Sequence, residues 1–375
     1  MAKTADTRHQ RTTAWAQRLL GFAVLAAAVY LVHRLVSEVG WDEVVQRLGE
    51  ARLPWVAAVA ACLVAQLATW AARQRLAVRR ISSTPPGWTL FLALVATAAA
   101  NFLLPFARLL GGLLRARFMS RSSSPRIPKR VYYGAVLFDQ VVHFLIMGTL
   151  TLVGLVLGAD ELGRPVAAAY IALGIVALAA VAGIWLHRRT GATGGGLVRF
   201  LERRTAEREG IVGRFLASSE TAAKIFFRLA ADGVLWRRAG ALGLGVFAFV
   251  AGAQWLTFHA LGVSVNPLWI VTTVSAGLSA GVLLGTPGGL GTTEATMIAL
   301  YHAFGIGTVD AASAVLLFRG LQFAVVLGTG LPSMLVLELY AIAVRRRNRQ
   351  KVEPEEAVTA VERSEPLQPV EKASG

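Results

Sequence analysis

The sequence predicts an all-α, polytopic membrane helical bundle with about six full crossings and two broken or re-entrant hairpins, about eight membrane segments in pseudo-inverted halves. Only 16% of the 375 residues are charged, against roughly 25% in an ordinary soluble domain. The hydrophobic fraction is 55% and the mean hydropathy is +0.55. Several apolar runs approach the ~20 residues that an α-helix needs to cross a hydrocarbon core of ~30 Å. Basic residues gather between these runs.

Three regions follow from this pattern. Residues 1–18 form a basic N-terminus, residues 19–344 a membrane domain, and residues 345–375 a disordered tail of low apolar content. The first apolar run is expected to be an uncleaved anchor, because the run before a possible cleavage site is short for a signal peptide. The expected full crossings are residues 19–36, 54–72, 131–157, 165–186, 240–261 and 309–344.

The positive-inside rule orients the chain in the cell (inner) membrane with both termini cytoplasmic. The N-terminus is basic, and Arg345-Arg346-Arg347 follow the last apolar run. The loop 187–239 carries eleven Arg and Lys against five Asp and Glu, so we expect it to be cytoplasmic. Its apolar spacing over residues 197–235 predicts amphipathic helices on the inner surface.

The first broken hairpin is inferred from a conflict between two basic loops. Residues 73–87 and 115–130 carry no acid and should both be cytoplasmic, yet only one apolar run, 88–104, separates them. Residues 106–114 are too short to return across the membrane as a helix. Residues 88–114 are therefore expected to enter and leave on the same side, with a turn at Pro105.

The second broken hairpin follows from the same argument. The apolar runs 268–284 and 290–304 must make an even number of passes for the chain to end inside. Their break is expected at Gly285-Thr286-Pro287-Gly288-Gly289, and this hairpin opens from the outside. Thr292 and Thr293 before Glu294 predict a hydroxyl-capped helix start, whose amides either bind an anion or simply form a capped turn.

Charged residues recur at similar spacing in the two halves. Arg115 precedes Asp139 by 24 residues, and Glu294 precedes Arg319 by 25. Charges inside a span cost at least ~2.5–3.5 kcal/mol each on insertion scales, so they are functional or paired. One interpretation is a polar groove for a lipid headgroup, and the other is two structural salt bridges, Arg115–Asp139 and Glu294–Arg319. His143 shares a helix face with Asp139.

Other classes of function find little support. The net charge of +16 indicates contact with the anionic inner leaflet, and the basic clusters lack the interleaved aromatics of nucleic-acid binding. The single cysteine, Cys62, allows no intramolecular disulfide, and the histidines show no metal-ligand spacing, so no metal or cofactor is expected. A membrane-embedded glycosyltransferase would need an acidic catalytic pair in an outer loop, for which Asp42-Glu43 is a candidate. We therefore expect a protein that is not an enzyme.

Two long motifs resemble the lysylphosphatidylglycerol synthase transmembrane (flippase-like) family. The first is RLLGGLLRARFMSR followed by VLFDQVVHF, and the second is TPGGLGTTEATMIALYHAFG followed by LLFRGLQF. The resemblance covers about residues 15–345 and implies a module that moves phospholipid between leaflets. Only a polar tail follows Arg347, so we expect no aminoacyl-transferase domain and no lysylphosphatidylglycerol synthesis. By motif match, the site residues implied are Arg108, Gly112, Arg115, Asp139, Pro287, Gly288, Gly291, Glu294 and Arg319.

The sequence thus favours a lipid translocase that moves a phospholipid or a polyprenyl-linked lipid across the cell membrane. The expected substrate-binding residues are Arg108, Arg115, Asp139, Gly288, Gly291, Glu294 and Arg319. The arginines would attract phosphate, and the two acids would pair with them or with a headgroup amine. The alternative is a non-catalytic accessory subunit that scaffolds a glycosyltransferase or another envelope-biosynthesis enzyme.

Overall fold

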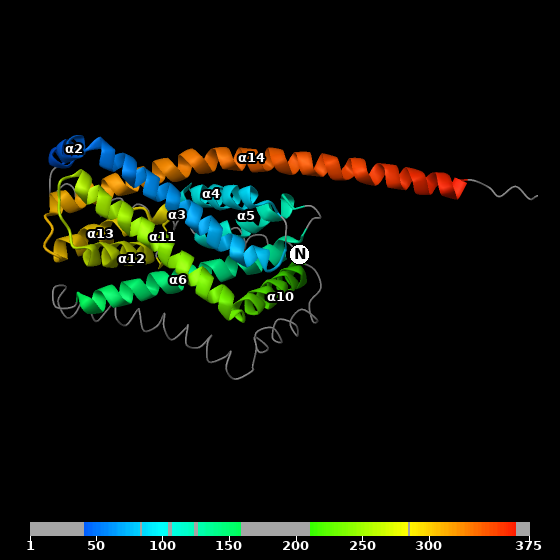
Figure 1. The fold of residues 1–375 in the computed structure, drawn as a ribbon, viewed down its shortest axis with the longest axis horizontal. Coiled ribbons are helices and arrows are strands. Elements are labelled where there is room, and N and C mark those ends of the chain that lie inside the picture. The colour runs from blue at the N-terminus through cyan, green and yellow to red at the C-terminus, as the bar shows by residue number, and fades with distance from the viewer. Residues whose placement is uncertain are drawn as a thin grey trace, which may run out of the picture.

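The computed structural model describes residues 41–82, 85–103, 107–123, 127–158, 211–283 and 286–364. Two of the six expected crossings, 19–36 and 165–186, and the N-terminal region lie outside these ranges. All regular structure in the described ranges is helical (Figure 1). The helices are α2 (Trp41–Gly49), α3 (Leu53–Arg79), α4 (Gly87–Leu103), α5 (Ala107–Arg121), α6 (Lys129–Leu157), α10 (Ile211–Ala230), α11 (Gly233–Ala260), α12 (Pro267–Leu283), the 3-10 turn η1 (Pro287–Gly289), α13 (Thr292–Ala303) and α14 (Thr308–Ser364).

Four helices are long and apolar enough to cross a membrane: α3, α6, α11 and the first part of α14, Thr308–Val344. Each corresponds to an expected full crossing. Two shorter apolar helices, α4 and α12, are the first arms of the two expected hairpins. The described part of the chain is therefore a membrane helical bundle, and its core packs α3 closely along α11.

Helix starts follow the local sequence. Pro54 lies in the first turn of α3, where its missing N–H removes no intrahelical bond. Asp232 caps α11 by accepting a hydrogen bond from the Leu235 backbone N–H at 2.9 Å. This bond lowers the pKa of the Asp232 carboxyl below its usual value. Asn266 accepts likewise from the Leu268 N–H at 3.0 Å at the start of α12.

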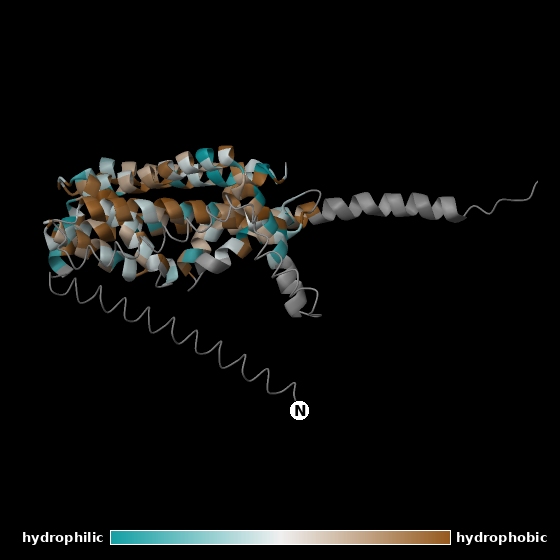
Figure 2. Ribbon diagram, turned by 90° about the horizontal axis from the view of Figure 1, so that it is seen from below, coloured by the Kyte–Doolittle hydropathy of each residue, from teal (hydrophilic) through white to brown (hydrophobic). Residues whose placement is uncertain are grey.

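The bundle is apolar outside and locally charged inside. Hydrophobic residues predominate along its helices (Figure 2), and large apolar side chains such as Leu53, Leu157 and Leu339 are exposed on its surface. Arg73, Arg115 and Asp139 are by contrast fully buried. This inversion of the soluble pattern is what a lipid environment favours, because exposed leucine costs nothing there.

The two hairpins approach each other from opposite ends of the bundle (Figure 1). α4 begins beside the late part of α14, where Trp88 contacts Tyr340 edge to face at 4.8 Å. α12 begins at the other end, where Trp269 stacks on Phe304 at 4.3 Å. The break of the second hairpin meets the end of α4, since η1 packs on α4 and Gly288 lies against Phe102. A Cβ at Gly288 would approach a carbon of the Phe102 ring to 2.9 Å.

Two segments that the sequence predicts to be cytoplasmic, the amphipathic segment and the C-terminal tail, differ in structure from the prediction. The amphipathic segment does not lie free on a surface where it is described: α10 packs on α6, and Gly134 admits the Ala222 carbonyl and the Ile225 side chain. The expected disordered tail is helical as far as Ser364, because α14 continues through a segment rich in Arg and Glu, which are good helix formers.

Candidate functional site

The Asp139 cluster, formed by Trp70, Arg73, Arg115 and Asp139, joins α3, α5 and α6. Arg73 Nε donates to Asp139 Oδ1 at 2.7 Å, and Trp70 Nε1 donates to Asp139 Oδ2 at 2.8 Å. Arg115 Nη1 lies 3.6 Å from Asp139 Oδ2. The two arginines and the aspartate are each only 1% exposed. Buried charges this close are tolerated because each is paired and hydrogen-bonded.

Arg73 is the principal ionic partner of Asp139, and the prediction that an inner loop begins at residue 73 is wrong. α3 continues to Arg79, and Trp70 and Arg73 are three residues apart, so they share a helix face. Arg115 does pair with Asp139, as the sequence suggested, but at the longer distance. Arg115 also donates from Nε to Thr97 Oγ1 at 3.0 Å and from Nη1 to Gln74 Oε1 at 3.3 Å.

A second group, the Arg319 cluster, is formed by Gly288, Glu294, Arg319 and Gln322. Arg319 Nε donates to Glu294 Oε1 at 2.5 Å, Nη1 to Gln322 Oε1 at 2.6 Å, and Nη2 to the Gly288 carbonyl at 2.6 Å. The Glu294–Arg319 pair is present as the sequence suggested. Through the Gly288 carbonyl, Arg319 also holds the break of the second hairpin.

The break itself depends on glycine conformations. Gly288, Gly289 and Gly291 have φ of +60°, +73° and +76°, in the left-handed region that favours glycine. Pro287 begins η1. The expected hydroxyl cap is wrong, because Gly291 occupies the N-cap of α13 without a side-chain bond. The Thr292 hydroxyl instead donates to the Gly289 carbonyl at 3.1 Å and so stabilises the turn before the helix.

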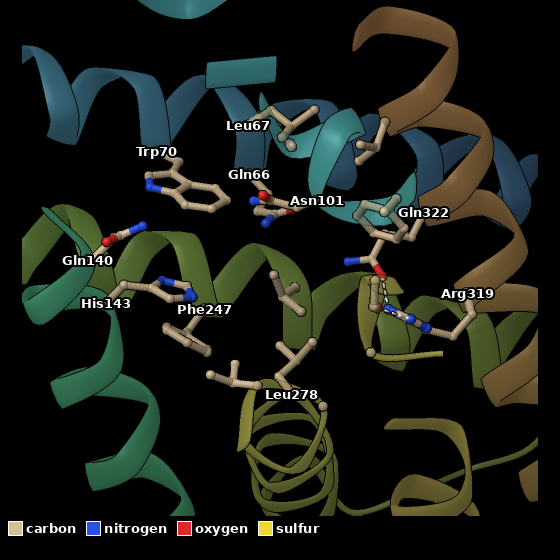
Figure 3. A pocket seen from close by; sticks show the side chains of 18 of the residues that line it. Gln66, Leu67, Trp70, Asn101, Gln140, His143, Phe247, Leu278, Arg319 and Gln322 are labelled. Carbon is tan, nitrogen blue, oxygen red and sulfur yellow. Dashed lines mark hydrogen bonds between the residues drawn. The ribbon is translucent and has the colours of Figure 1, made fainter. Parts of the chain in front are cut away.

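A cavity of about 270 Å³ lies between the two clusters. Figure 3 shows Trp70, Gln140 and His143 at one end, Arg319 and Gln322 at the other, and Gln66 and Asn101 between them. Apolar residues complete the wall, among them Leu67, Phe247, Val250 and Leu278. The His143 ring is stacked between Trp70, at 5.2 Å, and Phe247, at 5.0 Å. The cavity is therefore lined by both polar and apolar groups at the meeting point of the hairpins.

The expected site residues divide into three groups around this cavity. Arg115, Arg319 and Gly288 line it. Asp139 and Glu294 are buried behind the arginines with which they pair, and Gly291 caps α13 beyond the break. Arg108 lies in the first turn of α5, and its side chain falls outside the described residues.

Arg115 and Arg319 also form cation–π contacts with neighbouring aromatic rings. The Arg115 guanidinium lies 5.3 Å from the centre of the Trp70 ring. The Arg319 guanidinium lies 5.7 Å from the centre of Phe102 and 5.3 Å from that of Phe323. Such contacts stabilise a buried guanidinium that is not fully neutralised by its carboxylate.

Sequence reasoning missed Arg73 and Trp70, and it missed the amides that line the cavity. For Arg73 and Trp70 the signal was present, because a tryptophan and an arginine three residues apart lie on one face if the helix continues. The amides are Gln66, Asn101, Gln140 and Gln322. Amides carry no charge, so a search for charged residues within apolar runs does not single them out.

Two α5 glycines make room for two of these amides. A Cβ at Gly111 would overlap the side-chain amide of Asn101. A Cβ at Gly112 would lie 3.2 Å from Gln140 Nε2, tighter than ordinary van der Waals contact. The Gly-Gly pair of the first motif therefore positions polar groups of α4 and α6. In the described residues, no group of three or more His, Cys, Asp or Glu is placed to hold a metal ion.

Comparison with known proteins agrees with this architecture. The family model of the lysylphosphatidylglycerol synthase TM region matches residues 18–330, which include both hairpins and both clusters. No curated protein matches the chain. Since the match covers most of the sequence, the chain belongs to the lysylphosphatidylglycerol synthase TM region family of multi-pass membrane proteins.

Proposed function

We propose that the protein moves an amphiphilic lipid between the leaflets of the cell membrane, with the headgroup in the cavity between the two hairpin breaks. The observation that carries the proposal is this cavity, which joins two arginines and four amides inside an otherwise apolar bundle. A polar headgroup crosses the hydrocarbon core at high cost unless polar groups replace its water. The cavity supplies such groups.

The size and lining of the cavity suit a headgroup better than a whole lipid. Its volume of about 270 Å³ is near the lower end of ligand sites, which span roughly 300–1,000 Å³. Apolar side chains such as Leu278 and Val326 adjoin the polar ones, so acyl chains can stay in apolar surroundings. Arg115 and Arg319 line the cavity, and their positive charges attract a phosphate there, while the donors described above are bonded within the two clusters.

The arrangement of the hairpins supports movement from one leaflet to the other. Interrupted segments at corresponding places of two halves mark the midplane site of many secondary transporters. Under the positive-inside rule, the α4–α5 hairpin opens to the cytoplasm and the α12–α13 hairpin to the outside. The cavity at their breaks would then be reached in turn from each side.

The test is a leaflet-resolved assay of tail-labelled fluorescent phospholipid in proteoliposomes. We expect translocation by the unaltered protein and at least a tenfold loss, on the order of 1.4 kcal/mol, in Arg319→Gln. The matched control is Arg121→Gln, because Arg121 pairs with Glu338 on the surface, at 2.7 Å, outside the cavity. Equal rates in folded Arg319→Gln and in the control would contradict the role of the cavity. Absence of translocation, with an envelope enzyme co-purifying in stoichiometric amount, would favour the accessory-subunit alternative.

A further inference from the structure

The cavity wall is cationic and neutral, and the acids of the two clusters are withdrawn from it. Its described charged lining residues are Arg115 and Arg319, and none of its described lining residues is Asp or Glu. Asp139 and Glu294 pair with these guanidiniums but are not among the residues that line the cavity. A ligand in the cavity therefore meets arginines without meeting the carboxylates that pair with them.

The remaining polar lining groups suit hydroxyls. Gln66, Asn101, Gln140 and Gln322 carry amides, which contain both donors and acceptors, and the Gln322 oxygen already accepts from Arg319. Asn101 Oδ1 is buried and accepts no hydrogen bond from any residue that the structure describes. This oxygen is closed to a ligand, because it lies against Gly111 of α5, so the hydroxyl-binding groups of the wall are the remaining amide atoms, which can donate to or accept from a ligand O–H.

The described wall also lacks the carboxylates that commonly bind an ammonium ion. Two of its aromatic rings already have a guanidinium over them. Trp70 has the Arg115 guanidinium over its ring, and Phe102 has that of Arg319. A second cation placed there would be repelled by the first.

We propose that the cavity selects lipids with an anionic phosphodiester and an uncharged, hydroxyl-bearing headgroup, glycerol or sugar, and rejects aminoacylated, cationic headgroups. The phosphate lies toward Arg115 or Arg319, and the hydroxyls bond to the amides between them. This inference rests on the proposed lipid translocation. Under this proposal, the headgroup preference of this chain differs from the cationic lipid, lysylphosphatidylglycerol, that appears in the name of its family.

The experiment compares two tail-labelled lipids in the same proteoliposomes of full-length protein. One is phosphatidylglycerol, and the other is lysylphosphatidylglycerol, in which lysine esterifies a glycerol hydroxyl and reverses the net charge. The acyl chains are identical, so only the headgroup differs. We expect phosphatidylglycerol to move at least about tenfold faster, since like charges placed side by side in a site are strongly disfavoured. A sugar-phosphate lipid of the same chain length distinguishes glycerol from sugar as the preferred hydroxyl-bearing group.

A charge-introducing variant sharpens the result. Asn101→Asp puts a carboxylate of nearly the same shape in the cavity wall and should shift the rate ratio toward the lysyl lipid. The matched control is Asn266→Asp, since Asn266 is exposed at the start of α12 and does not line the cavity. The control should leave the ratio unchanged.

Failure of this inference differs from failure of the proposed function. Equal or faster movement of the lysyl lipid overturns the headgroup preference and leaves translocation in place. If neither lipid moves, translocation fails, and binding is then measured by thermal shift of the detergent-solubilised protein with short-chain forms of both lipids. Stronger stabilisation by the phosphatidylglycerol form supports the preference on its own, and equal or weaker stabilisation overturns it.

Discussion

The Asp139 cluster and the Arg319 cluster lie at corresponding places of two hairpins, yet they are built in opposite ways. In the first, a carboxylate is the centre, and two arginines and a tryptophan converge on it. In the second, an arginine is the centre, and a carboxylate, an amide oxygen and a backbone carbonyl converge on it. The first cluster carries one excess positive charge, whereas the charges of the second balance.

This difference matters for what each cluster does when one member is lost. Removing Asp139 would leave two buried guanidiniums without a counter-charge. Removing the charge of Glu294 would leave one guanidinium that still has two neutral oxygen acceptors. Similar sequence spacing therefore conceals unequal dependence on the acid.

The largest expected effect is that of Asp139→Asn. Leaving buried charge uncompensated costs about 3–5 kcal/mol, so we expect a strongly lowered unfolding temperature in detergent, followed by tryptophan fluorescence. Glu294→Gln keeps the Gln322 and Gly288 acceptors for Arg319 and should cost about 1–3 kcal/mol. If Glu294→Gln is the more damaging of the two variants, the unequal dependence is wrong.

The Glu294–Arg319 pair could be predicted from the sequence because both residues interrupt clearly apolar helices. The same held for Asp139, which lies within the apolar run 131–157. The partner Arg73 could not be placed in this way, because α3 becomes polar before it ends. Four arginines between residues 73 and 80 read as a loop, although the helix continues through Arg79 and buries one of them.

Side-chain direction set the other limit of sequence reasoning. The sequence indicated that the charges are paired or functional. It did not indicate that Arg115 and Arg319 line the cavity while Asp139 and Glu294 do not. That arrangement depends on helix packing, which the spacing of charges along the sequence does not show. The hairpin break at Gly288, in contrast, followed directly from loop charge and helix length, whereas the turn expected at Pro105 lies outside the described residues.

A smaller effect on stability is expected when either of the two arginines of the Asp139 cluster is replaced. Arg73→Met removes the 2.7 Å bond and should lower stability by about 1–3 kcal/mol. Arg115→Met leaves Asp139 bonded to Arg73 and Trp70 and removes the excess positive charge of the cluster, so its stability loss should be smaller.

Translocation should rank these two variants in the reverse order. Arg115 lines the cavity and Arg73 does not, so Arg115→Met should lose more of the lipid movement measured per folded protein. Both variants are compared at matched temperature below their unfolding transitions. A greater stability loss in Arg115→Met would show that the longer contact is the dominant one, contrary to the geometry.

The smallest effect is expected where an ion pair is exposed. Arg121 binds both oxygens of Glu338, at 2.7 and 2.8 Å, so its geometry is as good as that of the buried pairs. The Glu338 side chain is 48% exposed, however, and solvent replaces the lost contact. Arg121→Gln should therefore change stability by no more than about 0–1 kcal/mol. A loss as large as that of Glu294→Gln, measured in the same unfolding assay, would mean that bond geometry rather than burial decides the dependence on each charge.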